Sequence, residues 1–146
     1  MSQKKPWTGQ SVLIVDDSKY VRDDLRELYQ SIGMTVVGEA KNGVEALELA
    51  SKLNPDLVSL DIIMPEMNGI ECYQKMQLQP GNRRYIIISA LAAEQQVING
   101  LEGVVPRHLY LSKPATQTKL EERLKEVYDG PQIPQLNAPL MEVEGF

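Results

Sequence analysis

Cysteine, histidine, tryptophan and phenylalanine are nearly absent from this chain of 146 residues, and each of them occurs once. A single cysteine, Cys72, cannot form an internal disulfide, and nothing pairs with it at a metal-ligand spacing. The single histidine, His108, has no evident partner that would orient it as a base, so it is interpreted as a solvent-facing loop residue. These absences argue against a disulfide framework and against histidine chemistry as the basis of function.

Long apolar runs and an excess of basic charge are also lacking. No stretch approaches the ~20 apolar residues that cross a bilayer, and the first ten residues, MSQKKPWTGQ, lack the apolar segment of a signal peptide. Lysine and arginine number 15 against 20 acidic residues, and a formal net charge of -5 argues against sequence-independent nucleic-acid binding. We therefore expect a cytoplasmic protein with no membrane span and no DNA-binding module.

The chain does contain five short runs that are rich in valine, isoleucine and leucine. They are residues 11–16, 35–40, 56–61, 85–90 and 108–113. Most of these runs lack polar alternation, which is typical of strands that are covered on both faces in a parallel sheet. Segments with a helical period lie between and after them, at 20–32, 42–53, 68–79 and 116–128, whereas the pattern at 91–104 is weak.

Strand and helix thus alternate five times, which predicts an α/β fold. Because parallel strands need right-handed crossover connections, the expected architecture is a doubly wound five-stranded parallel sheet with alternating helices. We assign residues 10–128 to this domain and residues 1–9 to an N-terminal extension. Residues 129–146 form a Pro-containing acidic tail that we expect to be flexible. A docking segment remains the alternative for the tail, because it holds the only phenylalanine.

Polar side chains stand where the predicted strands end: Asp16 and Asp17 after the first, Asp61 after the third, Ser89 on the fourth and Lys113 on the fifth. In open α/β sheets the ligand crevice lies beyond these carboxyl ends. Three converging carboxylates repel one another unless a cation neutralises them, and oxygen ligands suit Mg²⁺. A carboxylate between magnesium and an ammonium group is arranged to accept a phosphoryl group, to which the hydroxyl of Ser89 adds a hydrogen bond.

Four motifs carry these residues, and together they resemble a known family. They are VLIVDDS (12–18), LVSLDIIMPEMNGIE (57–71), IIISA (86–90) and LYLSKP (109–114). Over roughly residues 10–128 the chain resembles the receiver domains of two-component response regulators. The resemblance implies the CheY-like, flavodoxin-like sheet with strand order 2-1-3-4-5 and a bound Mg²⁺ or Mn²⁺.

The resemblance also implies a role for each residue at the strand ends. Asp61 is then the phosphoacceptor, Asp17 binds the metal directly, and Asp16 acts through water or by positioning. Ser89 and Lys113 hold the phosphoryl oxygens and share the catalytic work with Asp61. A cis peptide bond is implied between Lys113 and the proline that follows it.

Three further positions extend this interpretation. The resemblance makes the main-chain carbonyl of Ile63 a metal ligand, and it makes Tyr110 a switch whose ring swings inward when Ser89 moves toward the phosphoryl group. Ile63 and Leu91 stand two residues after the acceptor and the hydroxyl residue, where side chains tune the access of water. Because both are apolar, we hypothesise slow spontaneous dephosphorylation.

The expected function is that of a stand-alone receiver. It would take a phosphoryl group from a histidine kinase or a phosphotransfer protein and signal by phosphorylation-dependent protein binding, as in chemotaxis or a phosphorelay. It is therefore expected to be a signalling protein and not an enzyme, although it catalyses its own phosphorylation and dephosphorylation. A phosphorylation-independent adaptor remains an alternative. An aspartyl-phosphate phosphatase would need a second acidic residue two positions after the nucleophile, where this chain has Ile63.

The chain departs from the family pattern in EGVVPRHLYLSKP (102–114). Receivers usually carry a Gly-Ala pair and then an acidic residue before the aromatic position, whereas here Pro106 precedes a basic Arg-His pair. The departure predicts an altered shape for the fourth helix and its loop, and therefore for the partner surface that receivers build from the fourth helix, fifth strand and fifth helix.

Overall fold

The computed structural model describes residues 4–62, 64, 67–90 and 105–130. Its strands are β1 (Ser11–Val15), β2 (Thr35–Ala40), β3 (Leu57–Leu60), β4 (Arg84–Ser89) and β5 (Tyr110–Ser112). Its α-helices are α1 (Lys19–Ser31), α2 (Gly43–Leu53), α3 (Gly69–Met76) and α5 (Gln117–Asp129). All strand pairs are parallel, and the order is β2-β1-β3-β4-β5. The predicted doubly wound sheet and its strand order are confirmed.

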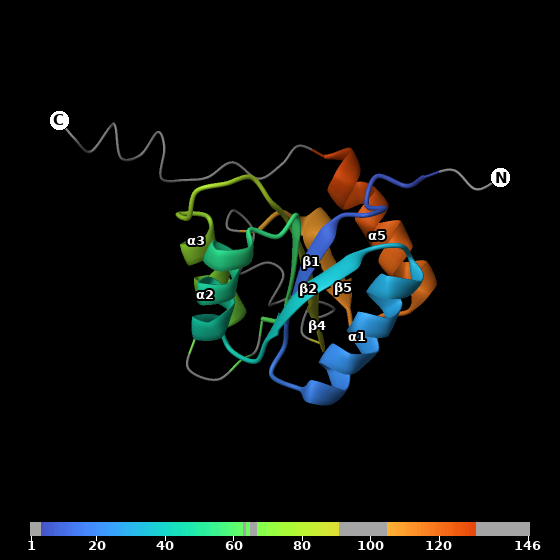
Figure 1. Ribbon diagram of the computed structural model, residues 1–146. Coiled ribbons are helices and arrows are strands. Elements are labelled where there is room, and N and C mark those ends of the chain that lie inside the picture. Colours follow the sequence, from blue (N-terminus) through green and yellow to red (C-terminus); the bar gives the residue numbers. More distant parts are fainter. Residues whose placement is uncertain (1–3, 63, 65–66, 91–104, 131–146) are drawn as a thin grey trace.

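The sheet lies between two layers of helices. Helices α1 and α5 cover one face, and α2 and α3 cover the other (Figure 1). The predicted helix at 91–104 and the tail from residue 131 onward lie outside the described residues. Within the described part of the chain, no helix combines the length and the apolar character that crossing a membrane requires.

Side-chain caps explain where the helices begin. Ser18, Asn42, Asn68 and Thr116 each precede an α-helix, and each side chain accepts a hydrogen bond from the N–H group three residues further on. Such caps satisfy N–H groups that have no partner inside the helix. Three of the four helices begin just beyond the carboxyl end of a strand, so the caps also fix the strand-to-helix turns at this edge of the sheet.

The buried face of α2 differs in part from the one that the helical period predicts. That period places Val44, Leu47, Ala50 and Leu53 on the core side; Ala50 is buried, whereas Val44 and Leu53 are 43% and 37% exposed. The buried positions of α2 are Gly43, Ala46 and Ala50. A Cβ atom on Gly43 would lie 2.9 Å from the side chain of Met67, so α2 lies too close to its neighbours for large side chains on that face. Glycine and alanine carry little hydropathy signal, so of the three small residues on this face the prediction included only Ala50.

The fifth strand is shorter than predicted. A 3₁₀-helix, η2 (Arg107–Leu109), occupies the start of the segment in which we had predicted a strand. The N–H group of Leu109 donates to the carbonyl of Pro106 at 3.1 Å. Proline has no N–H group for a sheet ladder, so the chain turns before it enters β5. His108 lies in this turn and is half-buried, so the interpretation of a solvent-facing loop residue was only partly correct.

The edge of the sheet opposite the carboxyl ends of the strands is closed by aromatic side chains. Trp7, from the predicted N-terminal extension, is 3% exposed, and its indole N–H donates to the carbonyl of Ile32 at 3.2 Å. Its ring packs against Tyr128 of α5 at 6.3 Å between centroids. The Tyr128 hydroxyl donates to the side chain of Gln10 at 2.7 Å, and the Arg84 guanidinium lies 4.8 Å from the centre of the Tyr128 ring. Residues before β1 therefore contribute to the core.

Candidate functional site

The carboxyl ends of β1, β3 and β5 bring four of the predicted residues together. One carboxylate oxygen from each of Asp16, Asp17 and Asp61 lies within 4.8 Å of the other two. Asp16 and Asp61 are 1% and 4% exposed, whereas Asp17 faces solvent. The Nζ atom of Lys113 lies 2.8 Å from Oδ2 of Asp16 and 3.3 Å from Oδ2 of Asp61. The lysine therefore bridges two buried carboxylates.

This bridge determines the protonation of the lysine. Burial alone would lower the pKa of Lys113, but hydrogen bonds to Asp16 and Asp61 and the attraction of their charges raise it above its usual value. The lysine is accordingly a cation at neutral pH. Three carboxylates against one ammonium group leave two unit negative charges in the cluster, which one divalent cation would balance. Carboxylate oxygens are the donors that Mg²⁺ takes, so the residues present fit that ion.

Asp16 is held by hydrogen bonds from several directions. Its N–H group donates to the carbonyl of Ala40 at 3.0 Å, which ties it to the end of β2. Its Oδ1 atom accepts the N–H of Ser18 at 2.9 Å. Its main-chain carbonyl accepts Nη1 of Arg22 on α1 at 2.7 Å. Sequence reasoning missed Arg22, although a basic residue six positions after Asp16, one turn into the following helix, was a visible signal.

The main chain at Asp61 is fixed by the helix that follows it. The N–H of Asp61 donates to the carbonyl of Val15 at 3.0 Å, and the N–H of Gly69 donates to the carbonyl of Ile62 at 2.7 Å. A Cβ atom on Gly69 would overlap the carbonyl oxygen of Asp61 and lie 2.7 Å from Cα of Ile62. Only glycine allows α3 to begin this close to the main chain of Asp61 and Ile62. The cap residue Asn68 was predicted, but this close approach was not.

Ser89 and Tyr110 lie on neighbouring strands of the same site. Ser89 is 1% exposed at the end of β4, and its carbonyl accepts the N–H of Lys113 at 3.3 Å. The ring of Tyr110 is 6% exposed, so it already occupies a buried position, and its hydroxyl has no hydrogen-bond partner among the described residues. Burial raises the pKa of Tyr110 to about 12, with a partly opposing effect of Arg107.

Three predicted features remain: the cis peptide bond before Pro114, and the roles of Ile63 and Leu91. The peptide bond between Lys113 and Pro114 is cis, which confirms that prediction. Ile63 and Leu91 lie outside the described residues, so the metal-ligand role of the first and the water-access role of both stay predictions.

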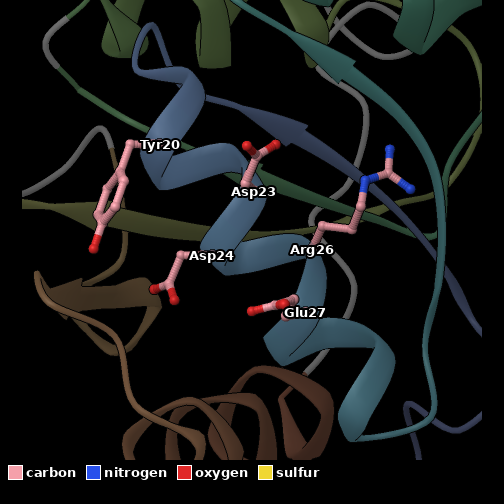
Figure 2. A pocket seen from close by; sticks show the side chains of 5 residues that line it. All are labelled: Tyr20, Asp23, Asp24, Arg26 and Glu27. Atoms are coloured by element: carbon pink, nitrogen blue, oxygen red, sulfur yellow. The ribbon is translucent and has the colours of Figure 1, made fainter.

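The exposed face of α1 forms a surface beside the site. Figure 2 shows the side chains that line it: Tyr20, Asp23, Asp24, Arg26 and Glu27. Tyr20 is 83% exposed although it is a large aromatic residue one turn after the acidic pair. Tyr20 and Asp24 also line a second, more apolar hollow with Lys113 and Pro114. This surface is therefore continuous with the lysine of the carboxylate cluster.

Comparisons with known proteins agree with this geometry. Residues 12–125 match the model of the response regulator receiver domain. The chain is 36% identical to chemotaxis protein CheY of Thermotoga maritima over 119 residues, which are 82% of this chain and 98% of the relative. It is 37% identical over 103 residues to the nitrate/nitrite response regulator NarL of Escherichia coli, covering 70% of this chain and 46% of that protein.

Among solved structures, the CheX–CheY–BeF3–Mg complex of Borrelia burgdorferi contains a chain that is 34% identical. It superposes with a TM-score of 0.72 over 83% of this chain and 90% of that one. The response regulator domain of Thermotoga maritima CheB is 31% identical, with a TM-score of 0.71 over 84% and 98% of the two chains. The match of the family model over most of the described domain, together with these relatives, shows that the chain belongs to the response regulator receiver family.

Proposed function

We propose that this protein accepts a phosphoryl group on Asp61 from a histidine kinase or a phosphotransfer protein and signals through phosphorylation-dependent binding to another protein. The observation that carries the proposal is the bridge of Lys113 between Asp16 and Asp61 beside three clustered carboxylates. It is a signalling protein of the cytoplasm and not an enzyme that acts on a separate substrate.

The proposed reaction follows from the position of Asp61. One oxygen of its carboxylate forms a bond to phosphorus while the bond from phosphorus to the donor nitrogen or oxygen breaks, and the electron pair of that bond stays with the donor. The product is a mixed anhydride of carboxylate and phosphate. The carboxylates of Asp16, Asp17 and Asp61 would hold magnesium, which would supply positive charge to the transferring phosphoryl group.

Lys113 and Ser89 would act on the phosphoryl oxygens. In the structure the lysine is already desolvated in part and charged, 3.3 Å from the acceptor carboxylate. Once the Asp61 oxygen is bonded to phosphorus it is no longer anionic, and the transferred phosphoryl oxygens bring their own negative charge to the site. The ammonium group can then move from the carboxylate to those oxygens. A preorganised cation in a partly buried site stabilises such charge more than water does. The buried hydroxyl of Ser89 would donate to another phosphoryl oxygen.

The comparisons support the signalling part of the proposal. The match to the chemotaxis protein CheY of Thermotoga maritima covers 98% of that protein, so nearly the whole relative is aligned with this chain. The Borrelia burgdorferi neighbour was solved as a complex of CheX and CheY with BeF3 and Mg²⁺. By analogy we propose that the protein acts as a stand-alone receiver, with a chemotaxis or phosphorelay partner as its target.

The surface on α1 offers a place for the phosphoryl donor to dock. A donor that reaches Asp61 must pass close to Lys113, and the hollow that Lys113 lines also includes Tyr20. Replacing Tyr20 with alanine should therefore slow phosphoryl transfer from a protein donor. Transfer from a small phosphodonor needs no docking surface, so its rate should stay within about twofold of that of the original protein.

The direct test is incubation with a small phosphodonor and Mg²⁺, followed by intact-mass measurement. The unmodified sequence should gain the mass of one phosphoryl group, and Asp61→Asn should gain none. Asp24→Asn is the matched control, because it removes an exposed carboxylate of α1 and should be phosphorylated normally. If the unmodified protein gains no phosphoryl mass, the proposal is wrong, and a phosphorylation-independent adaptor becomes the better interpretation.

A further inference from the structure

Arg22 on α1 is the one cation that contacts the main chain of the acidic pair in the described structure. Its Nη1 atom lies 2.7 Å from the carbonyl oxygen of Asp16, a length typical of a charge-assisted hydrogen bond. Its side chain is only 14% exposed. The guanidinium group therefore makes a well-shielded contact and is not a solvated surface charge.

A second contact fixes the direction of this guanidinium. Nε of Arg22 lies 3.1 Å from Oε1 of Glu39 on β2, and Nε of Arg26 lies 2.7 Å from Oε2 of the same carboxylate. Glu39 thus joins two arginines of α1 to the sheet. Of the two, only Arg22 contacts Asp16 in the described structure, so the pair offers an internal comparison.

The carbonyl that Arg22 holds belongs to the peptide unit between Asp16 and Asp17. This unit is planar, so fixing its oxygen fixes the direction in which the chain enters Asp17. The Asp17 carboxylate has no hydrogen-bond or ion-pair partner among the described residues, and its side chain faces solvent. Its place in the carboxylate cluster is therefore set mainly by its own main chain.

We propose that Arg22 is a positioning residue for the metal site: it orients the Asp16–Asp17 peptide so that the Asp17 carboxylate is preorganised for a divalent cation. The inference rests on the magnesium site of the proposed function. Groups that orient metal ligands contribute to affinity because the ligands then lose less freedom on binding.

The direction in which an Arg22 substitution changes metal affinity distinguishes between two effects of the residue. A positive charge near a cation site repels the cation, so charge removal alone would strengthen metal binding. Loss of the hydrogen bond to the Asp16 carbonyl would weaken it. Arg26→Met removes an equal charge from the same Glu39 and leaves the Asp16 carbonyl untouched. A comparison of Arg22→Met with Arg26→Met therefore separates positioning from electrostatics.

The experiment titrates the metal-free protein with Mn²⁺ alone and follows the loss of the free-ion electron paramagnetic resonance signal. We expect Arg22→Met to raise the dissociation constant for Mn²⁺ about fivefold or more. This is less than the loss expected for a residue that hydrogen-bonds a ligating side chain, because Arg22 contacts only the main-chain carbonyl of Asp16. Arg26→Met should stay within about twofold of the original protein. Circular dichroism confirms that each variant is folded.

Arg22→Lys keeps the charge but replaces the planar fork, which reaches Glu39 through Nε and the Asp16 carbonyl through Nη1, with a compact ammonium group. It should also weaken binding, and it decides the question if Arg22→Met does not fold. Equal dissociation constants for the original protein and the folded Arg22 variant would overturn the inference, as would equal losses in the Arg22 and Arg26 variants. Absence of Mn²⁺ binding in the original protein would instead overturn the metal site itself.

Discussion

The close approach of Gly69 to the main chain of Asp61 and Ile62 predicts that Gly69→Ala will destabilise the fold and displace Asp61. The added methyl group would overlap the carbonyl oxygen of Asp61 and lie 2.7 Å from Cα of Ile62, and neither backbone atom can rotate away. Overpacking of this kind costs about 1–3 kcal/mol. Displacing the helix start would also weaken the hydrogen bond from the N–H of Gly69 to the carbonyl of Ile62, worth about 1 kcal/mol.

Helix propensity opposes these costs, because alanine is preferred over glycine by up to about 1 kcal/mol inside a helix. The net expectation for Gly69→Ala is a loss of about 2 kcal/mol, which for a protein of this size lowers Tm by about 4–8 °C. Urea unfolding followed by the fluorescence of Trp7, the only tryptophan and a buried one, measures this change.

Gly130→Ala is the matched control. A Cβ atom there meets its nearest neighbours at 3.5 Å, an ordinary contact, and the φ of -81° suits any residue. Its unfolding free energy should change by less than about 0.5 kcal/mol. Phosphorylation by a small donor should slow in folded Gly69→Ala and stay unchanged in Gly130→Ala. If the two variants are equally stable, the reasoning about the start of α3 is refuted.

Three further predictions concern the site. Mg²⁺ at ten times its dissociation constant should raise the free energy of unfolding in urea by about 1.4 kcal/mol. Asp17→Asn should abolish this gain. In metal-free buffer the same substitution should not lower stability, because it relieves repulsion between like charges. Burial raises the pKa of Tyr110 from 10.0 in the unfolded chain to about 12 in the fold, so the stability that the neutral hydroxyl contributes is complete below pH 10 and is lost as the pH rises toward 12. The unfolding free energy of Tyr110→Phe should therefore depend less on pH between 10 and 12. An unchanged pH dependence would contradict the burial argument. Loss of phosphate from the phosphorylated protein should be faster in Ile63→Asn and Leu91→Glu, and equal rates would remove the idea that apolar side chains exclude the attacking water.

The parts of the fold that the sequence predicted are those governed by periodicity. Uninterrupted apolar runs indicated β1, β3 and β4, which are buried along nearly their whole length. Parallel strands place their carboxyl ends at one edge, so polar residues at the strand ends had to meet there. That rule predicted from the sequence alone that Asp16, Asp17, Asp61 and Lys113 lie close together.

The parts that the sequence did not predict depend on contacts between main chain and side chain. A sequence pattern records side-chain types, whereas Arg22 acts on a carbonyl group and Gly69 acts by having no side chain at all. The pairing of Lys113 with Asp16 was also missed, because the expected partner of the lysine was a phosphoryl group. In the structure the negative charges in contact with Lys113 are the buried carboxylates of Asp16 and Asp61.

The two edges of the sheet therefore contribute to the protein in opposite ways. At the carboxyl edge, buried Asp16 and Asp61 share one ammonium group, and the excess of negative charge destabilises the fold. At the other edge the groups are better satisfied: the N–H of Ser11 donates to the Asp56 carboxylate at 2.9 Å, and the N–H of Asp56 donates to the Ser11 hydroxyl at 2.9 Å.

This asymmetry has a consequence for function. A site with an excess of negative charge binds a cation more tightly, because binding removes the repulsion between its carboxylates. Under the proposed function, phosphorylation would add negative charge to the same edge, and Lys113 together with a bound cation would balance it. The lysine would then have to exchange Asp16 for the phosphoryl oxygens, and this exchange of partners is the local event from which a change in partner affinity can start.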